Sequence, residues 1–232
     1  MVDQSVTDAF VLAGGQSTRM GRDKALLEID GRPLLEHMLE LLRGLGLNPR
    51  ICGSRPDLAR FAEVVPDNFP QCGPLGGIEA VLAVSDTDLN LFVPVDLPGL
   101  PREFLRWIMA RAERSHAVAT IPRFGDRPQP LCAVYSRRLR HGLERFLLAG
   151  NSKVMTAVRE AAASLGEGVD EFDVESVAST LAPSEWPSNP PIAAWFRNVN
   201  TPAEYESQCA AAGAKRRHPI SSKQRSASAE SR

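Results

Sequence analysis

The chain has 232 residues, of which 43% are hydrophobic and 24% charged, a composition ordinary for a soluble enzyme with a real core. Its formal net charge of −1 gives no reason to expect nucleic acid or an anionic membrane as a partner, and no apolar run approaches membrane-spanning length. The four cysteines and four histidines are dispersed without a C-x-x-C or H-E-x-x-H pattern, which argues against a zinc site or a disulfide framework and predicts a cytoplasmic protein.

The first predicted element is a buried strand at residues 9–13, an apolar run that leads into a glycine-rich segment at residues 14–24. Glycines let backbone N–H groups approach a ligand closely, and cations beside them suit a polyphosphate. The spacing excludes a P-loop, whose lysine directly follows the second glycine, and also the G-x-G-x-x-G fingerprint. An ordinary turn with surface charges is the alternative, but the crowding of these residues favours a phosphate site. They are Gly14, Gly15, Arg19, Gly21 and Lys24.

The segment from Leu12 to Lys24, Leu-Ala-Gly-Gly-x-Ser-x-Arg-Met-Gly-x-Asp-Lys, resembles the N-terminal signature of molybdenum cofactor guanylyltransferases. These are nucleotidyltransferases with a nucleotide-diphospho-sugar transferase fold, and the resemblance extends over residues 8–212. Relatives that use CTP usually carry Leu-Ala-Ala-Gly, so the Gly14-Gly15 pair favours GTP. The resemblance implies that the backbone from Leu12 through Ala13 to Gly15 carries the nucleotide. Lys24 and Arg19 would neutralise the triphosphate and the leaving pyrophosphate.

Short strands and helices alternate over the next part of the chain. An extended piece at 26–31 precedes a helix that starts at Pro33 and ends at Gly44 to Gly46, followed by a strand at 50–52, a helix at 56–62 and a strand at 64–65. This alternation predicts an α/β fold, a single-domain, Rossmann-like three-layer sandwich with a mostly parallel central sheet.

Asp67 follows the predicted strand at 64–65, and the resemblance implies that it lies in the nucleotide site. The chain departs from the family pattern nearby, because several members carry an asparagine near the end of the second strand as a base contact. This chain has Cys52-Gly53-Ser54 there. The reaction type is therefore better determined than the base specificity.

Gly73-Pro74-Leu75-Gly76-Gly77 opens a predicted helix that runs to about Val84. Glycine and proline before an apolar run are a common helix start, which accounts for the pattern structurally. A similar Gly-Pro-Leu-Gly/Ala-Gly element of the family lies against the nucleotide. Together with the first loop, this favours a nucleotide-binding role for Gly76.

A nearly uninterrupted apolar run at 89–95 predicts a central strand that ends in Asp96-Leu97-Pro98. Open α/β sheets bind ligands at the carboxyl ends of their strands, and an aspartate there is a suitable magnesium ligand. A turn aspartate before proline is the alternative. The family has Asp-x-Pro at this place, so the resemblance favours Asp96 as a ligand of both nucleotide and Mg²⁺.

The second half predicts a helix from Pro101, strands at 116–121 and 131–135 joined by a polar loop at 122–130, and helices at 137–148 and 152–163. Gln129, followed by Pro130 and Leu131, resembles the acceptor-side loop of the family. Lys153 stands where the family often has a basic residue facing the cofactor phosphate. A solvated helix lysine is an equally good interpretation of Lys153.

Residues 183–191 are proline-rich and predict a surface loop, and the following segment contains Asn198-Val199-Asn200-Thr201-Pro202. Thr201 and Glu204 form a predicted capping box, with Pro202 at the first helical position. The box leaves Asn198 and Asn200 unexplained, and they match the acceptor-side Asn-x-Asn-Thr-Pro motif of the family. We expect a nucleotidyltransferase domain over 1–212 and a basic, disordered tail over 213–232.

The resemblance implies transfer of GMP from GTP to the phosphate of molybdenum-loaded molybdopterin, with Mg²⁺ as cofactor. The acceptor phosphate is already ionised, so the reaction needs positioning and charge neutralisation rather than a strong general base. Cofactor-insertion proteins or molybdoenzymes are further candidate partners. The alternatives are a cytidylyltransferase for the same cofactor, another phosphate-acceptor nucleotidyltransferase, and a nucleotide-binding adaptor without turnover. Gly15 argues against CTP, the Asn198–Pro202 motif against sugars, and Lys24 with Asp96 against an adaptor.

Overall fold

The computed structural model describes residues 7–14, 23–181, 191–201, 203–204 and 207. Gly15, Arg19 and Gly21, residues 183–190 of the expected proline-rich loop, and the expected tail at 213–232 lie outside the described residues.

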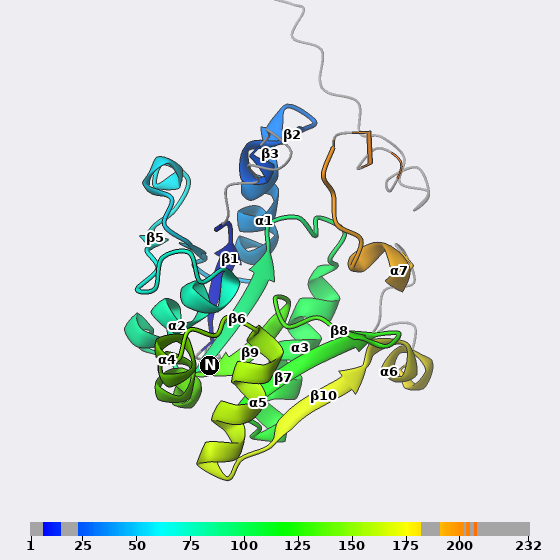
Figure 1. Ribbon diagram of the computed structural model, residues 1–232. Helices are drawn as coiled ribbons and strands as arrows, with labels where there is room; N and C mark the ends of the chain where they lie inside the picture. The colour runs from blue at the N-terminus through cyan, green and yellow to red at the C-terminus, as the bar shows by residue number, and fades with distance from the viewer. Residues whose placement is uncertain (1–6, 15–22, 182–190, 202, 205–206, 208–232) are drawn as a thin grey trace, which may run out of the picture.

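A mixed sheet of eight strands forms the centre of the fold, in the order β10-β7-β9-β6-β1-β4-β5, with β8 paired to β7 (Figure 1). Strands β4, β1 and β6 run parallel side by side, while β9 is antiparallel to both of its neighbours. A separate hairpin is formed by β2 and β3. The strands are β1 (Thr7–Leu12), β2 (Glu28–Ile29), β3 (Arg32–Pro33), β4 (Arg50–Cys52), β5 (Val64–Val65), β6 (Leu89–Pro94), β7 (Ala119–Phe124), β8 (Arg127–Pro128), β9 (Ala133–Ser136) and β10 (Val169–Asp173).

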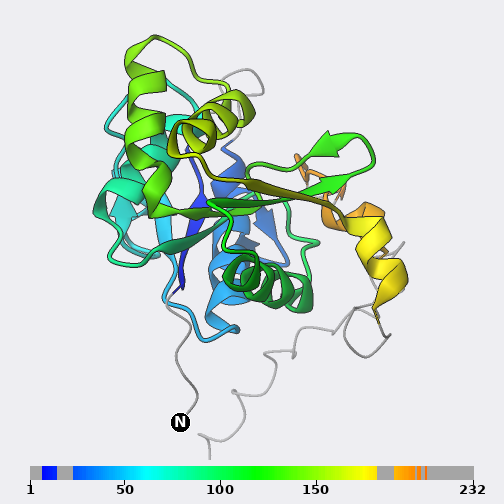
Figure 2. The same ribbon diagram turned by 90° about the horizontal axis from the view of Figure 1, so that it is seen from below.

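Helices cover both faces of this sheet, as Figure 2 shows for α3 on one side and for α4 and α5 on the other. Side chains alternate along β1, so Ala9 and Val11 pack with α1 and α3, whereas Phe10 and Leu12 pack with α2, α4 and α5. The predicted three-layer α/β fold is confirmed. The helices are α1 (Leu34–Arg43), α2 (Pro74–Val84), α3 (Arg102–Ser115), α4 (Arg140–Leu148), α5 (Val154–Leu165), α6 (Val174–Thr180) and α7 (Ile192–Trp195), with 3-10 turns η1 (Lys24–Leu26), η2 (Pro56–Leu58) and η3 (Arg137–Leu139).

In the part of the chain that the structure describes, no helix combines the length and the apolar character that crossing a membrane would require.

The helix predicted at 56–62 is wrong, because only the 3-10 turn η2 forms there. The backbone N–H groups of Leu58, Ala59 and Phe61 each donate to the carbonyl three residues earlier, so the stretch forms tight 3-10 turns instead of an α-helix. The strand predicted at 116–121 begins later, at Ala119, and continues into the predicted polar loop, where β7 and β8 form a hairpin turning at Gly125. Strand β10 and helices α6 and α7 were not predicted from the sequence.

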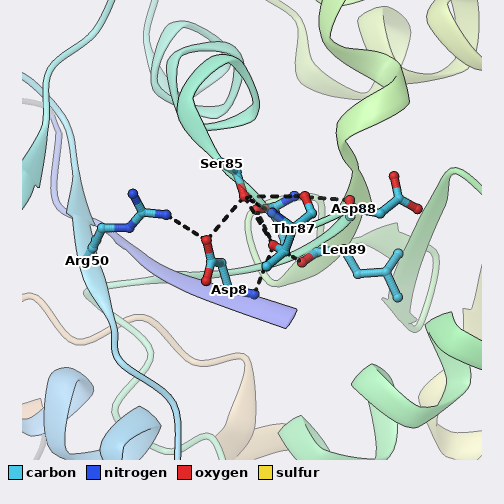
Figure 3. A network of polar contacts seen from close by, with 7 residues as sticks. Asp8, Arg50, Ser85, Thr87, Asp88 and Leu89 are labelled. Carbon is cyan, nitrogen blue, oxygen red and sulfur yellow. Dashed lines mark hydrogen bonds and ion pairs between the residues drawn. The ribbon is translucent and has the colours of Figure 1, made fainter. Parts of the chain in front are cut away.

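A polar network holds the amino ends of the parallel strands together (Figure 3). The Asp8 carboxylate on β1 accepts hydrogen bonds from Arg50 Nη2 of β4 at 2.7 Å and from Ser85 Oγ, at the end of α2, at 3.2 Å. The Thr87 hydroxyl accepts from the Asp8 backbone N–H and donates to the Leu89 carbonyl of β6. Three neighbouring strands and the end of α2 are thereby fixed in register, which also aligns the strands' opposite, carboxyl ends.

Replacing Ser85 tests the contribution of this network. Ser85 is fully buried, donates to Asp8 and accepts the Thr87 N–H, so Ser85→Ala removes two hydrogen bonds from partly buried groups. We expect the free energy of unfolding, measured by urea denaturation, to fall by about 1–3 kcal/mol.

Ser179→Ala is the matched control, because the exposed Ser179 hydroxyl only donates to a carbonyl of its own helix. Its effect should stay within about 0.5 kcal/mol. Equal losses in the two variants would contradict a stabilising role for the network.

Candidate active site

A cavity of about 440 Å³ lies at the carboxyl ends of β1, β4 and β6. This is where open α/β sheets bind ligands, and the volume falls within the range of small-molecule sites. Much of its wall is backbone or apolar, with a few polar side chains. It is lined by Leu12, Gly14, Cys52, Gly53, Asp67, Gln71, Gly73, Pro74, Gly77, Pro94, Val95, Asp96 and Leu131.

Two glycines from neighbouring strands meet in the wall of this cavity. Gly53 has a φ of 137°, and a Cβ there would lie 2.8 Å from the Cα and N of Gly14. Ala13, beside Gly14, donates its N–H to the Cys52 carbonyl at 3.1 Å. Position 53 therefore requires glycine, both for its backbone conformation and for the close approach of β1 to β4.

Asp67 projects a carboxylate into the cavity wall from the segment after β5. Its Oδ1 is buried and has no hydrogen-bond partner among the described residues, and its N–H donates to Ser54 Oγ at 3.1 Å. Burial raises the pKa of the Asp67 carboxyl above its ordinary value, against a lowering effect of a backbone hydrogen bond from Ser54. A carboxylate in a cavity wall is a candidate acceptor for a ligand N–H.

Lys24 and Asp96 form an ion pair beside the cavity, with Lys24 Nζ 2.9 Å from Asp96 Oδ2. Lys24 lies in η1, after the glycine-rich segment, and Asp96 follows the end of β6. Both side chains keep some exposure, 28% for Lys24 and 17% for Asp96, so each can be reached by a ligand. The structure thus brings together a cation and a carboxylate that the sequence suggested separately.

Asp96 fits a metal that arrives together with a ligand better than a resident metal. Among the described residues, no group of three or more His, Cys, Asp or Glu side chains is placed to hold an ion. Mg²⁺ is commonly held by one or two carboxylates while substrate phosphates and water complete its shell. A single carboxylate at the edge of a cavity suits that arrangement.

The predicted acceptor-side segment is anchored to the same place. Val199 is fully buried and donates its N–H to the Asp96 carbonyl at 2.9 Å, between an exposed Asn198 and a half-buried Asn200. The predicted capping box is confirmed, because Thr201 Oγ1 accepts from the Glu204 N–H and Glu204 Oε2 accepts from the Thr201 N–H. Glu204 also accepts the Asn200 N–H at 2.6 Å, which fixes the backbone that carries both asparagines.

The other predicted site residues are more dispersed. Gln129 is half-buried two positions before the cavity residue Leu131, and the exposed Lys153 directly precedes α5. Gly76 does not line the cavity, since it packs so closely against the Phe69 carbonyl that a Cβ would lie 2.7 Å away.

Gly53, Gly77 and Gln71 are among the cavity residues that were not predicted as site residues from the sequence. Gly53 and Gly77 owe their importance to close tertiary approaches, although a glycine directly after a short strand is a usable signal. Gln71 lines the cavity with a φ of 66°, which is uncommon outside glycine and has no sequence signal.

Comparison with known proteins relates this architecture to nucleotide chemistry. Residues 9–165 match the model of the MobA-like NTP transferase domain. A molybdenum cofactor guanylyltransferase of Xanthomonas euvesicatoria is 36% identical over 197 residues, covering 84% of this chain and 90% of that protein. The corresponding protein of Syntrophotalea carbinolica is 32% identical, with 85% and 88% covered. The crystal structure of molybdopterin-guanine dinucleotide biosynthesis protein A from Archaeoglobus fulgidus has the same fold, with a TM-score of 0.68, 24% identity, and 87% and 96% of the chains covered.

Gly77→Ala tests the close packing behind the cavity wall. The added Cβ would lie 2.6 Å from Cys52 Sγ and 3.1 Å from Asp67 Oδ1, so we expect a loss of about 1–3 kcal/mol in the free energy of unfolding. Adding Cys52→Ala removes the nearer obstacle. A double-mutant cycle should therefore show that Gly77→Ala costs less in the Cys52→Ala background.

Gly168→Ala serves as the control, because a Cβ at Gly168 meets no atom of the described residues within 4 Å. Additive effects of the Cys52 and Gly77 substitutions would show that the two residues are not in close contact.

Proposed function

The chain belongs to the MobA-like NTP transferase domain family, and on this basis we propose that it is a molybdenum cofactor guanylyltransferase. The enzyme transfers GMP from GTP to the phosphate of molybdenum-loaded molybdopterin. An oxygen of the acceptor phosphate forms a bond to the α-phosphorus of GTP, the bond from that phosphorus to the bridging oxygen breaks, and pyrophosphate leaves. The products are the guanine dinucleotide form of the cofactor and pyrophosphate.

The observation that carries this proposal is the ion pair of Lys24 and Asp96 beside the cavity at the carboxyl ends of the strands. Transfer between two anions requires a cation for the phosphates and a carboxylate for their metal, both within reach of one nucleotide. An adaptor that only holds a nucleotide has no need of both groups at one point.

The nucleotide contacts divide along the cavity wall. Backbone groups from Leu12 through Ala13 to Gly15 hold the nucleotide together with the start of α2, where Gly73, Pro74 and Gly77 line the cavity and Gly76 packs against the Phe69 carbonyl. The Asp67 carboxylate recognises the base by accepting hydrogen bonds from the N–H groups at N1 and N2 of guanine. Cytosine does not present this pair of donors. The position of Asp67 in the cavity wall supports this assignment, since a carboxylate there can accept from the base.

The charged groups act on the triphosphate. Lys24 leaves Asp96 to neutralise the phosphates, and Arg19 neutralises the leaving pyrophosphate. Asp96, once free of Lys24, holds a divalent metal, for which we propose Mg²⁺. When bound, the metal neutralises charge on the phosphates and makes the α-phosphorus more electrophilic.

The acceptor lies on the side of Asn198 and Asn200, which flank the residue that is hydrogen-bonded to the Asp96 backbone. Gln129 contributes from the loop before β9, and Lys153 meets the acceptor phosphate. Cofactor-insertion proteins or molybdoenzymes receive the product. We place the reaction in the cytoplasm; the three cysteines in the described part of the chain, Cys52, Cys72 and Cys132, are free thiols, as a reducing compartment would keep them.

Pyrophosphate release tests the function directly. We expect release in the presence of Mg²⁺ to require both GTP and molybdenum-loaded molybdopterin, with CTP and ATP much less effective. Preference for CTP would contradict base reading by Asp67. Nucleotide binding without release from any donor would favour the adaptor interpretation.

Two variants in the same assay test the residue roles. Asp96→Asn should abolish release while circular dichroism and the melting temperature stay close to wild type, and full activity would remove Asp96 from the metal role. Asp67→Asn should reduce the preference for GTP over CTP by about 10- to 100-fold, since it replaces one acceptor with a donor. An unchanged preference would place base recognition elsewhere.

A further inference from the structure

Arg55 is a buried cation that the proposed mechanism does not use. It lies between β4 and η2, and its side chain is only 10% exposed. The guanidinium donates to Asp57 through Nε at 2.8 Å and Nη2 at 2.6 Å, and Nη2 also donates to Asp23 Oδ2. Arg55 therefore joins the β4–β5 connection to the end of the glycine-rich segment.

Asp23 has a second task, because it caps the turn that carries Lys24. Its Oδ1 accepts the Ala25 N–H at 3.0 Å, while its other oxygen is held by Arg55. The turn η1 is three residues long, and its backbone hydrogen bonds from Leu26 and Leu27 are both 3.2 Å long. So short a turn depends on its cap, and the cap depends on Arg55.

A series of contacts thus runs from Arg55 to Asp23, to the backbone N–H of Ala25 next to Lys24, and through Lys24 Nζ to Asp96. A lysine has a long, flexible side chain, so the position of its ammonium depends on how firmly the backbone beneath it is held. The always-charged, planar guanidinium suits this anchoring task better than another lysine would.

We propose that Arg55 is a positioning residue: through Asp23 it holds the turn that delivers Lys24 to the phosphates of the bound nucleotide. This inference rests on the proposed function and adds to it a residue that acts through Lys24 without contacting the substrate.

Arg55→Gln is the primary variant. Glutamine keeps a polar side chain but lacks the positive charge and the paired N–H donors of the guanidinium. The side chains of Asp23 and Asp57 are 30% and 53% exposed, so water can solvate them when Arg55 is replaced. We expect a loss of up to about 100-fold in the rate of pyrophosphate release, as for a displaced catalytic group. Binding of GTP should weaken while binding of guanosine, which has no phosphates, stays unchanged. Equal weakening of both ligands would indicate general damage to the cavity and overturn the proposal.

Asp57→Asn is the matched control, because it removes the other carboxylate partner of the same guanidinium and leaves the Lys24 cap in place. Activity within about 2-fold of wild type is expected, as for a partly exposed ion pair. A loss as large as that of Arg55→Gln would trace the effect to η2 and contradict positioning through Lys24. Asp23→Asn, which retains a capping side chain but not the charge, should reproduce the Arg55→Gln phenotype and carries the test if Arg55→Gln does not fold.

The decisive comparison uses a Lys24→Ala background. If Arg55 acts through Lys24, adding Arg55→Gln to Lys24→Ala causes no further loss of the residual rate. Multiplicative losses would overturn the inference even if the wild-type enzyme turns over normally. Absence of turnover by the wild-type enzyme would instead refute the proposed function, so the two failures are distinguishable.

Discussion

Lys24 and Asp96 are 72 residues apart in the sequence, and their charges meet at 2.9 Å beside the cavity. The pair sets the requirement that the rest of the molecule satisfies: a lysine after β1 and an aspartate after β6 must reach the same point. Parallel pairing of β1 with β6 brings these two strand ends to one edge of the sheet. In the free protein each charge satisfies the other, and in the proposed complex the lysine turns to phosphate and the carboxylate to metal.

Contacts at both ends of the parallel strands contribute to this geometry. At the amino ends, the Asp8 network fixes β1, β4 and the connection into β6. At the carboxyl ends, the absence of a side chain at Gly53 lets β4 approach β1 closely enough to form the cavity wall. Arg55 then extends from β4 to the turn of Lys24, so the same strand shapes the cavity and anchors its cation.

Much of the fold could be predicted from the sequence, because apolar runs and the glycine and proline residues that bound them are local signals. The strand ending before Asp96 and the helix after Pro33 follow from such patterns, whereas β10 and the 3-10 turn at Pro56 depend on what packs against them. The same division holds for the site. Lys24, Asp67 and Asp96 stand in recognisable motifs, but the pairing of Lys24 with Asp96, the unpaired oxygen of Asp67 and the contact of Arg55 with Asp23 exist only once distant segments meet.

The most direct measurement of the central claim is a pair of affinities for Lys24→Ala: Mn²⁺ without nucleotide, by electron paramagnetic resonance, and GTP without metal, by calorimetry. Because Lys24 occupies Asp96 in the free protein, its removal should strengthen Mn²⁺ binding by releasing the carboxylate. Because Lys24 also serves the phosphates, the same change should weaken GTP binding. Opposite signs are the expected result. An unchanged or weaker affinity for Mn²⁺ would contradict the account, since Asp96 would then not be the group that the lysine and the metal share.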